Sequence, residues 1–462
     1  MLVDTRPDES GMKRVIESLF APTARITRGW TWLVALLLIG LGVCFWQAAS
    51  WHGGHLNLEL TSNDQKVYMN LGASMKESNY EFFLPRMRMP LYMAYLSLFY
   101  EVGTTVEDFF PVARQANILL CLLCVSGLAL GFRFWLGRGL GVMAALLSGF
   151  TWFIEKAGYV QPEALLATLT GLSCAMLAEL LRKPVWWKAV VAGLLVAAWH
   201  MTKASGPVVL GMFFVAWSLK MIRPRQTGRK TLLVAAAVLL GSFTLPLVPY
   251  LTATARVFGS PFYNTQSKFF VWCENAAEKR AVQNMEVDYR PPTAAELAVL
   301  PSAEKYLEKH SFKDIRKRIE SGFLVSVRSA HAQHPELFFV LVLCGCLLLG
   351  SVILWPRDAW VLVKDRPAEL VLAGGVIGGF VLLFSWMQPV RIGMRSMTSI
   401  HLVPLFFSLL WMHEIVRDKV WRLNGMVLSV EKLIIGCILL PALLILGCSV
   451  LFVELPGFYF GE

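Results

Sequence analysis

Long apolar runs recur along the whole chain and limit what it can fold into. A run of about 20 apolar residues is long enough to cross a bilayer as a helix, and we predict eleven such runs in the 462 residues. Because only 16% of the residues are charged and 56% are hydrophobic, a water-soluble globule, a disordered chain and a coiled coil are excluded. We therefore expect an all-α polytopic integral membrane protein with a single domain over 1–462. The predicted spans are 29–48, 112–132, 139–155, 162–181, 188–202, 205–220, 231–252, 336–355, 368–388, 400–413 and 433–454.

The net charge of +11 indicates membrane orientation rather than a nucleic-acid partner. About half of the 43 Lys and Arg residues fall in the short segments that share a side with the N-terminus, which places that side in the cytoplasm. The first apolar run is preceded by Asp4, Asp8 and Glu9 and has no small-residue cleavage site after it. It is therefore predicted to be an anchor rather than a removable signal peptide.

Cysteine and histidine give no sign of a disulfide framework or a metal site. The nine Cys residues fall almost entirely inside predicted spans, and Cys273 stands alone in a large external segment. Two histidine pairs, His52/His55 and His331/His334, have spacings suited to two ligands. Neither pair has a nearby set of Cys, Asp or Glu to complete a tetrahedral site, so we expect interfacial histidines and no metal ligand.

Most of the mass outside the membrane is predicted in two external loops, 49–111 and 253–335. In the first loop, Val67, Leu71 and Met75 recur every four residues, which predicts a short helix lying along the membrane surface with that face buried.

Polar residues of the first loop admit two interpretations each. Asp64 is either part of a helix start, with Ser62 and Gln65 forming a capping box, or a carboxylate held at the interface as a general base. Arg86 and Arg88 either contact lipid headgroups or bind a ligand phosphate.

The second loop reads as helical, with a capping box at Thr293 and Glu296. Its basic run is expected to form a solvated face or to contact headgroups; the run comprises Lys305, Lys309, Lys313, Arg316, Lys317 and Arg318. The start of the loop offers aromatic and amide groups suited to stacking on a sugar and hydrogen bonding to it, namely Tyr263, Asn264, Lys268 and Trp272.

Four more charged residues lie at the predicted outer ends of spans, where charge is costly and often functional. Glu163 either stabilises the start of its helix or contributes to a site. Lys203 either snorkels outward or binds phosphate, and Arg391 and Arg395, four residues apart, are candidates for a lipid phosphate.

The order of these motifs resembles the GT-C superfamily of membrane glycosyltransferases that use polyprenyl-phosphate sugars. The resemblance rests on an Asp after the first span (Asp64), a Tyr four residues later (Tyr68), a basic residue before Pro-Leu (Arg88) and the Tyr159–Glu163 segment. It is strongest for the branch that contains protein O-mannosyltransferases and the lipid A aminoarabinose transferase. Further matches are Gly193 to Lys203, Arg256 to Tyr263, and Arg391 to His401.

The resemblance implies roles for these residues. Asp64 would take the proton from an acceptor hydroxyl. The donor phosphate would be bound by Arg88, Arg86, Lys203, Arg391 and Arg395, and the sugar or acceptor by Gln65, Tyr68, Glu163, Tyr263, Asn264, Lys268 and His401. Members of the superfamily often have an acidic residue after the Asp. Here that position is Gln65, so a divalent metal stays open and no metal ligand is assigned.

We therefore expect an inverting glycosyltransferase in the bacterial inner membrane, with its active site on the external face. Its partners would be a polyprenyl-phosphate-linked sugar donor, membrane lipids and an acceptor glycan, lipid or exported protein such as a pilin. Two alternatives stay open: an O-antigen ligase or polymerase type of oligosaccharide transferase that uses a diphosphate donor, and a flippase or transporter of lipid-linked sugars.

Overall fold

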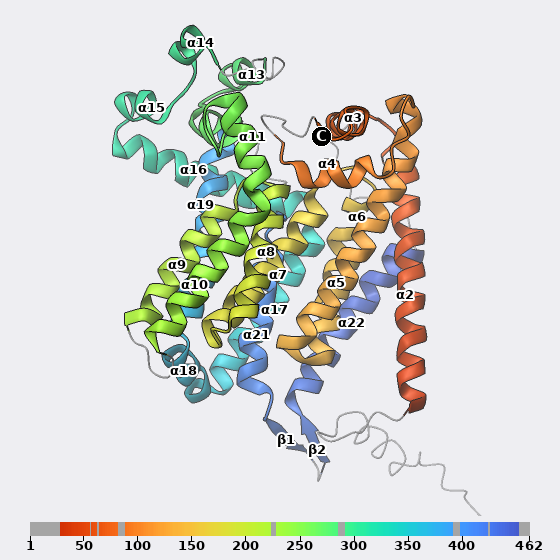
Figure 1. Ribbon diagram of the computed structural model, residues 1–462. Helices are drawn as coiled ribbons and strands as arrows, with labels where there is room; N and C mark the ends of the chain where they lie inside the picture. The colour runs from red at the N-terminus through yellow and green to blue at the C-terminus, as the bar shows by residue number, and fades with distance from the viewer. Residues whose placement is uncertain are drawn as a thin grey trace, which may run out of the picture.

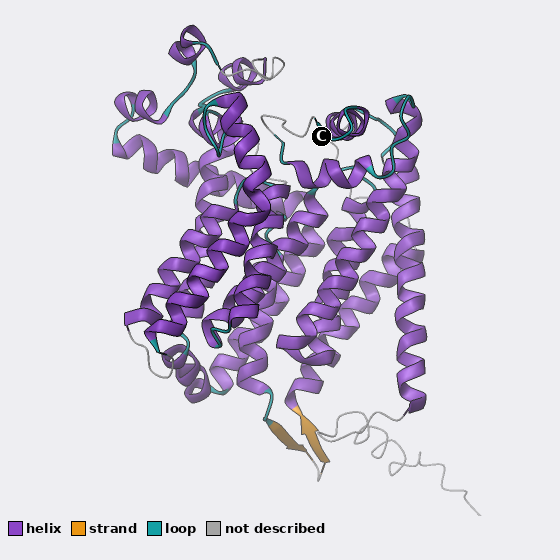
Figure 2. Cartoon of the chain, viewed as in Figure 1, coloured by secondary structure: helices purple, strands orange, loops and turns teal. Residues whose placement is uncertain are grey.

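The structure is a computed structural model that describes residues 28–55, 57–61, 64–81, 88–222, 228–284, 292–390, 398–423 and 426–451. It is an almost entirely helical bundle (Figures 1 and 2), which confirms the predicted fold class. Within those residues, six helical segments are long and apolar enough to cross a membrane. The bundle helices are α2 (Arg28–His55), α5 (Val106–Ser148), α7 (Glu163–Arg182), α8 (Trp186–Thr202), α9 (Gly206–Ile222), α10 (Arg229–Thr244), α17 (Pro335–Leu354), α19 (Pro367–Met387), α21 (Leu402–Val416) and α22 (Val430–Leu451).

Each of the eleven predicted runs overlaps a helix in the described residues, and two of them share α5 and the short elements after it. The helix is interrupted at Gly137, whose φ of 74° is open to glycine and strained for other residues. A Cβ on Gly141 would lie 2.5 Å from the backbone nitrogen of Arg133, so the chain doubles back tightly here. The second arm continues through a π-helical segment, η2 (Gly149–Phe153), into α6 (Ile154–Ala157).

The two predicted loops lie at the same end of the bundle, which we call the loop end (Figure 1). The first loop contributes α3 (Gln65–Glu77) and α4 (Pro90–Ser97), which pack against each other. The second loop and its approach from α10 contain η3 (Leu245–Leu247), α11 (Val248–Phe258), α12 (Thr265–Lys268), η4 (Phe270–Trp272), α13 (Ala276–Asn284), α14 (Ala294–Val299), α15 (Ala303–Lys309) and α16 (Phe312–Gln333). The capping box predicted at Thr293 and Glu296 is present at the start of α14.

The buried face of α3 differs from the predicted one. Met69 and Ala73 are buried together with Met75, whereas Val67 is 43% exposed. The residues buried within the protein are those next to α4, which packs against α3. The placement of Val67, Leu71 and Met75 against a membrane surface stays a prediction.

The opposite end of the bundle carries α18 (Pro356–Asp365) and a short antiparallel hairpin (Figure 1). The hairpin pairs β1 (Val420–Leu423) with β2 (Met426–Ser429), with Val420 opposite Ser429. The last short element, η6 (Gln388–Val390), follows α19 at the loop end.

Candidate functional site

An ion pair joins the two residues that the motifs single out in the first loop. Arg88 Nη2 lies 3.1 Å from Asp64 Oδ2, although 24 positions of sequence separate them. The Asp64 side chain is 44% exposed and that of Arg88 only 15%. The carboxylate is therefore open to an incoming molecule, and the guanidinium is held beneath it.

Asp64 is the N-cap residue of α3 and has a strained backbone. Its φ of 68° and ψ of 4° are left-handed, and its side chain makes no capping hydrogen bond to α3. A non-glycine residue in this region costs about 1–3 kcal/mol and persists only where the surroundings impose it. The helix-start interpretation of Asp64 agrees with its place at the N-terminus of α3, and its carboxylate also pairs with Arg88. Ser62, the other half of the expected capping box, lies outside the described residues.

Gln65 fixes the position of Asp64 through a buried amide pair. Asn57 Nδ2 donates to Gln65 Oε1 (2.6 Å), and Gln65 Nε2 donates in return to Asn57 Oδ1 (2.7 Å). The Val160 amide also donates to Gln65 Oε1 (2.9 Å), and Asn57 donates to the Gly158 carbonyl (2.7 Å). Gln65 is fully buried, so its side chain presents no exposed atom to a sugar and instead ties the Asp64 loop to residues 158–160.

Tyr68 lies beside the guanidinium of the Asp64–Arg88 pair. The Arg88 guanidinium carbon lies 5.4 Å from the centroid of the Tyr68 ring, within the range of a cation–π contact. The Tyr68 ring in turn meets Tyr92 of α4 edge to face, with 5.4 Å between centroids. Burial raises the pKa of the Tyr92 phenol well above its usual value, so its hydroxyl stays protonated and donates to Asn117 Oδ1 (2.8 Å).

Glu163 is buried at the start of α7, close enough to Tyr92 for an electrostatic interaction. Its Oε2 atom has no hydrogen-bond partner among the residues that the structure describes. The helix-start interpretation and a role in the site both agree with this position.

The start of the second loop reaches the first loop at Met89, the residue after Arg88. Asn264 Nδ2 lies 3.9 Å from Met89 Sδ, and the Tyr250 hydroxyl lies 3.6 Å from the same sulfur. Tyr263 is buried beside them, and exposed Lys268 has its Nζ 5.2 Å from the Tyr263 ring centroid. The structure thus places Asn264 beside Met89, the residue after Arg88, with Tyr263 and Lys268 next to it; a role for these residues in a site stays a prediction.

The remaining candidates are placed elsewhere or lie outside the described residues. Lys203 is half-buried at the end of α8. His401 is buried against Trp152, with 4.9 Å between ring centroids, and its Nδ1 is 2.7 Å from the Thr398 carbonyl, so it belongs to a different part of the loop end. Arg86, Arg391 and Arg395 are not among the described residues.

Part of the basic run in the second loop holds that loop together. Arg318 donates to the carbonyls of Cys273 (2.8 Å) and Trp386 (2.9 Å), and its guanidinium carbon lies 4.2 Å from the Trp386 ring centroid. Lys305 donates to three carbonyls at the end of α14 and the residues after it. The expected solvated face is therefore wrong for Lys305 and Arg318, whose charges are used within the loop.

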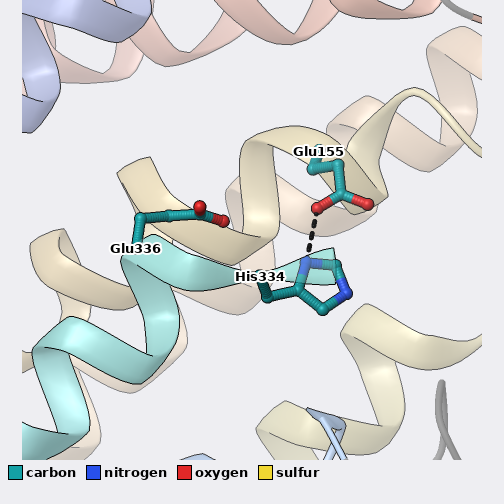
Figure 3. A group of neighbouring side chains, drawn as sticks. All are labelled: Glu155, His334 and Glu336. Carbon is teal, nitrogen blue, oxygen red and sulfur yellow. Dashed lines mark ion pairs between the residues drawn. The ribbon is translucent and has the colours of Figure 1, made fainter. Parts of the chain in front are cut away.

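A second polar cluster was missed. Glu155, His334 and Glu336 place one ligand atom each within 4.8 Å of one another (Figure 3). The expectation that His334 has no carboxylates nearby is wrong, because Glu336 follows it by two residues and α6 brings Glu155 to it. The spacing of His334 and Glu336 is visible in the sequence. Glu155 is distant in sequence and joins them only in the folded protein.

Comparison by sequence matches the chain to no family model and to no curated protein. Comparison by structure finds the Archaeoglobus fulgidus oligosaccharyltransferase AglB, solved with an inhibitory peptide and a dolichol-phosphate, at TM-score 0.54 and 15% identity, covering 93% of this chain and 57% of that one. A crystal structure of the same enzyme with zinc and sulfate matches at TM-score 0.53 and 15% identity, covering 92% and 53%. ArnT from Cupriavidus metallidurans bound to undecaprenyl phosphate matches at TM-score 0.33 and 16% identity, covering 84% and 78%.

The chain spans about half the length of the archaeal oligosaccharyltransferase structures that it matches. At this identity the likeness establishes the fold alone. The chain therefore shares the membrane fold of the archaeal oligosaccharyltransferase structures.

Proposed function

We propose that the protein is an inverting glycosyltransferase that moves a sugar from a polyprenyl-phosphate donor to an acceptor hydroxyl. The observation that carries this proposal is the Asp64–Arg88 ion pair, in which an exposed carboxylate in a strained conformation lies against a mostly buried guanidinium. A general base and a fixed cation for a leaving phosphate are the two groups that such a displacement needs.

The reaction would be a single displacement. Asp64 accepts the proton of the acceptor hydroxyl while the hydroxyl oxygen forms a bond to the anomeric carbon. The bond between that carbon and the phosphate oxygen breaks on the opposite side, which inverts the configuration. Arg88 stabilises the negative charge on the departing polyprenyl phosphate, because a guanidinium provides a two-pronged donor for phosphate oxygens.

The ion pair also gives an order to these events. Without a donor, Arg88 is paired with Asp64. The phosphodiester of the donor carries one negative charge, as a carboxylate does, but its two free oxygens can accept two hydrogen bonds from the same guanidinium. Donor binding would therefore draw Arg88 away from Asp64 and release the carboxylate to act as a base. Tyr68 would keep the guanidinium in place during this exchange.

The residues around Asp64 do not fit a divalent cation. The described residues there supply one carboxylate and one guanidinium, and the neighbouring Gln65 amide is consumed by Asn57 and Val160. We therefore route no step of the reaction through a metal at Asp64, although one of the similar structures was solved with zinc.

The wider setting of the reaction is proposed on the same grounds. Charge distribution favours a loop end on the external face of a bacterial inner membrane. The loops 49–111 and 253–335 then form the catalytic part of the single domain 1–462, with Tyr263, Asn264 and Lys268 at the sugar or acceptor side and Glu163 and Lys203 as further contacts. The acceptor would be a glycan, a lipid or an exported protein.

The test is a transfer assay with the full chain in lipid nanodiscs. Labelled polyprenyl-monophosphate sugars and polyprenyl-diphosphate oligosaccharides are supplied separately with envelope extract as acceptor, and transfer is followed by mass spectrometry. We expect transfer from the monophosphate donor, and a loss of about 10²–10⁴-fold in Asp64→Asn, the range typical of a general base. The matched control is Glu81→Gln, an exposed acid of the same loop, which should leave the rate unchanged.

Three results would contradict the proposal. Normal turnover in Asp64→Asn would show that Asp64 is not the general base. Transfer from the diphosphate donor alone would indicate an oligosaccharide ligase or polymerase. Movement of the lipid-linked sugar across proteoliposomes without transfer would indicate a flippase.

A further inference from the structure

The cluster of Glu155, His334 and Glu336 joins two elements that are far apart in sequence. Glu155 lies on α6, His334 is the residue before α17, and Glu336 lies in the first turn of α17. Figure 3 shows the three side chains turned toward one another. One ligand atom from each lies within 4.8 Å of the others, and His334 Nδ1 is 2.8 Å from Glu155 Oε2.

The close contact between His334 and Glu155 is an ion pair in a buried position. The His334 side chain is 3% exposed, and its Nδ1 has no hydrogen-bond partner of acceptable geometry among the residues that the structure describes. The nitrogen thus lies against one carboxylate, and the second carboxylate of the cluster, from Glu336, lies within 4.8 Å of both. Two ligand atoms of one metal ion lie at such a distance without bonding to each other.

The remaining groups around the cluster set its charge. Lys156 Nζ is 2.7 Å from Glu155 Oε1, which neutralises one carboxylate and leaves Oε2 facing His334. His52 and His401 are within electrostatic range, of Glu155 and His334 respectively. A π-helical segment, η2, directly precedes α6, and such segments are frequent at functional sites because they redirect the side chains that follow.

We infer that Glu155, His334 and Glu336 bind one first-row divalent cation, with zinc as the best fit. An imidazole nitrogen with two carboxylates suits zinc, whereas magnesium and calcium prefer oxygen alone. The ion would tie α6 to the start of α17. Because Gly158 and Val160 follow α6 and hold the Asn57–Gln65 pair, the ion would also support the segment that positions Asp64.

The experiment measures zinc in the full chain, purified with an affinity tag that contains no histidine. After treatment with a chelator, the protein is incubated with zinc, passed through gel filtration and analysed for bound metal. We expect about one zinc per chain in the wild type, a rise in melting temperature on zinc addition, and visible absorption after cobalt substitution. His334→Asn and Glu336→Gln should lose all three responses.

The matched control is His331→Asn. This histidine lies one turn before His334, is exposed and meets Phe338 edge to face, so the variant should bind zinc as the wild type does. Failure of the wild type to bind zinc at micromolar free concentration would overturn the inference, as would equal binding by the His334 and Glu336 variants. If a variant fails to fold, the wild type still provides the test: a rise in its melting temperature on zinc addition supports the inference, and no rise contradicts it.

Discussion

Ion pairs at the two ends of the bundle are built differently. At the end opposite the loops, Arg182 donates to both oxygens of Glu369 (2.9 and 2.7 Å) and to Glu414 (3.0 Å). Arg366 donates to both oxygens of the same Glu414. At the loop end, one contact of 3.1 Å joins Arg88 to an Asp64 that is 44% exposed and conformationally strained.

The difference separates a pair that holds helices together from a pair that is suited to reaction. Arg182, Glu369 and Glu414 tie α7, α19 and α21 with side chains that are at most 16% exposed, so no ligand competes for them. Asp64 is open to solvent, and its partner guanidinium has the geometry that a phosphate prefers. We therefore expect the first pair to stabilise the bundle, and the second pair is the one on which the proposed function rests.

The largest effect on the rate of sugar transfer is expected from Arg88→Met. Removal of a preorganised donor to developing charge typically costs about 10²–10³-fold in rate. We expect a loss of transfer in this range with a weaker donor affinity, and little change in melting temperature. Transfer kinetics at varied donor concentration measure both. A folded Arg88→Met protein with wild-type transfer would leave the loop-end pair without a function.

The next effect is expected from Arg182→Met, which leaves the Glu369 carboxylate buried without its bidentate partner. Breaking a buried ion pair in this way costs about 3–5 kcal/mol. We expect a lower melting temperature in detergent with a normal rate of transfer per folded molecule. The control is Arg316→Met, which removes an exposed pair with Glu320 worth at most about 1 kcal/mol. Equal stability of the two variants would contradict the contrast between the ends.

A smaller effect is expected from Gln65→Leu. The substitution leaves the buried Asn57 amide and the Val160 amide without their acceptor, at about 1–3 kcal/mol for an unsatisfied buried group. The variant should lose both stability and transfer, because the loop of Asp64 is released. A variant that loses stability but keeps the wild-type rate per folded molecule would show that this anchoring does not position Asp64.

The smallest effect is expected from Tyr68→Leu, which removes the ring beside Arg88 but keeps an apolar side chain. A cation–π contact at a partly exposed site is worth about 0.5–1 kcal/mol, or a few-fold in affinity. Donor affinity should fall by that factor while the rate at saturating donor is kept. A loss as large as that of Arg88→Met would mean that Tyr68 contacts the donor itself.

The fold was predictable from sequence because apolar runs of bilayer length identify the spans. Asp64, Tyr68 and Arg88 were singled out because they lie in short motifs with a definite order, but the contact between Asp64 and Arg88 was not predicted. The left-handed backbone of Asp64, the Asn57–Gln65 pair and the Glu155–His334–Glu336 cluster were not predictable, because each depends on segments that only folding brings together. The hairpin at 420–429 was missed for a similar reason: its strands are four residues each, too short for an alternating pattern to stand out.

The central claim is that one ion pair contains both the base and the phosphate ligand, and that the donor separates them. Equilibrium binding of a polyprenyl-phosphate sugar to Asp64→Asn and Arg88→Met in nanodiscs tests it most directly. The account predicts that Asp64→Asn binds the donor at least as tightly as the wild type while failing to transfer it, because its Arg88 is already released. It predicts that Arg88→Met binds the donor weakly. Weaker binding in Asp64→Asn, or wild-type binding in Arg88→Met, would contradict the account.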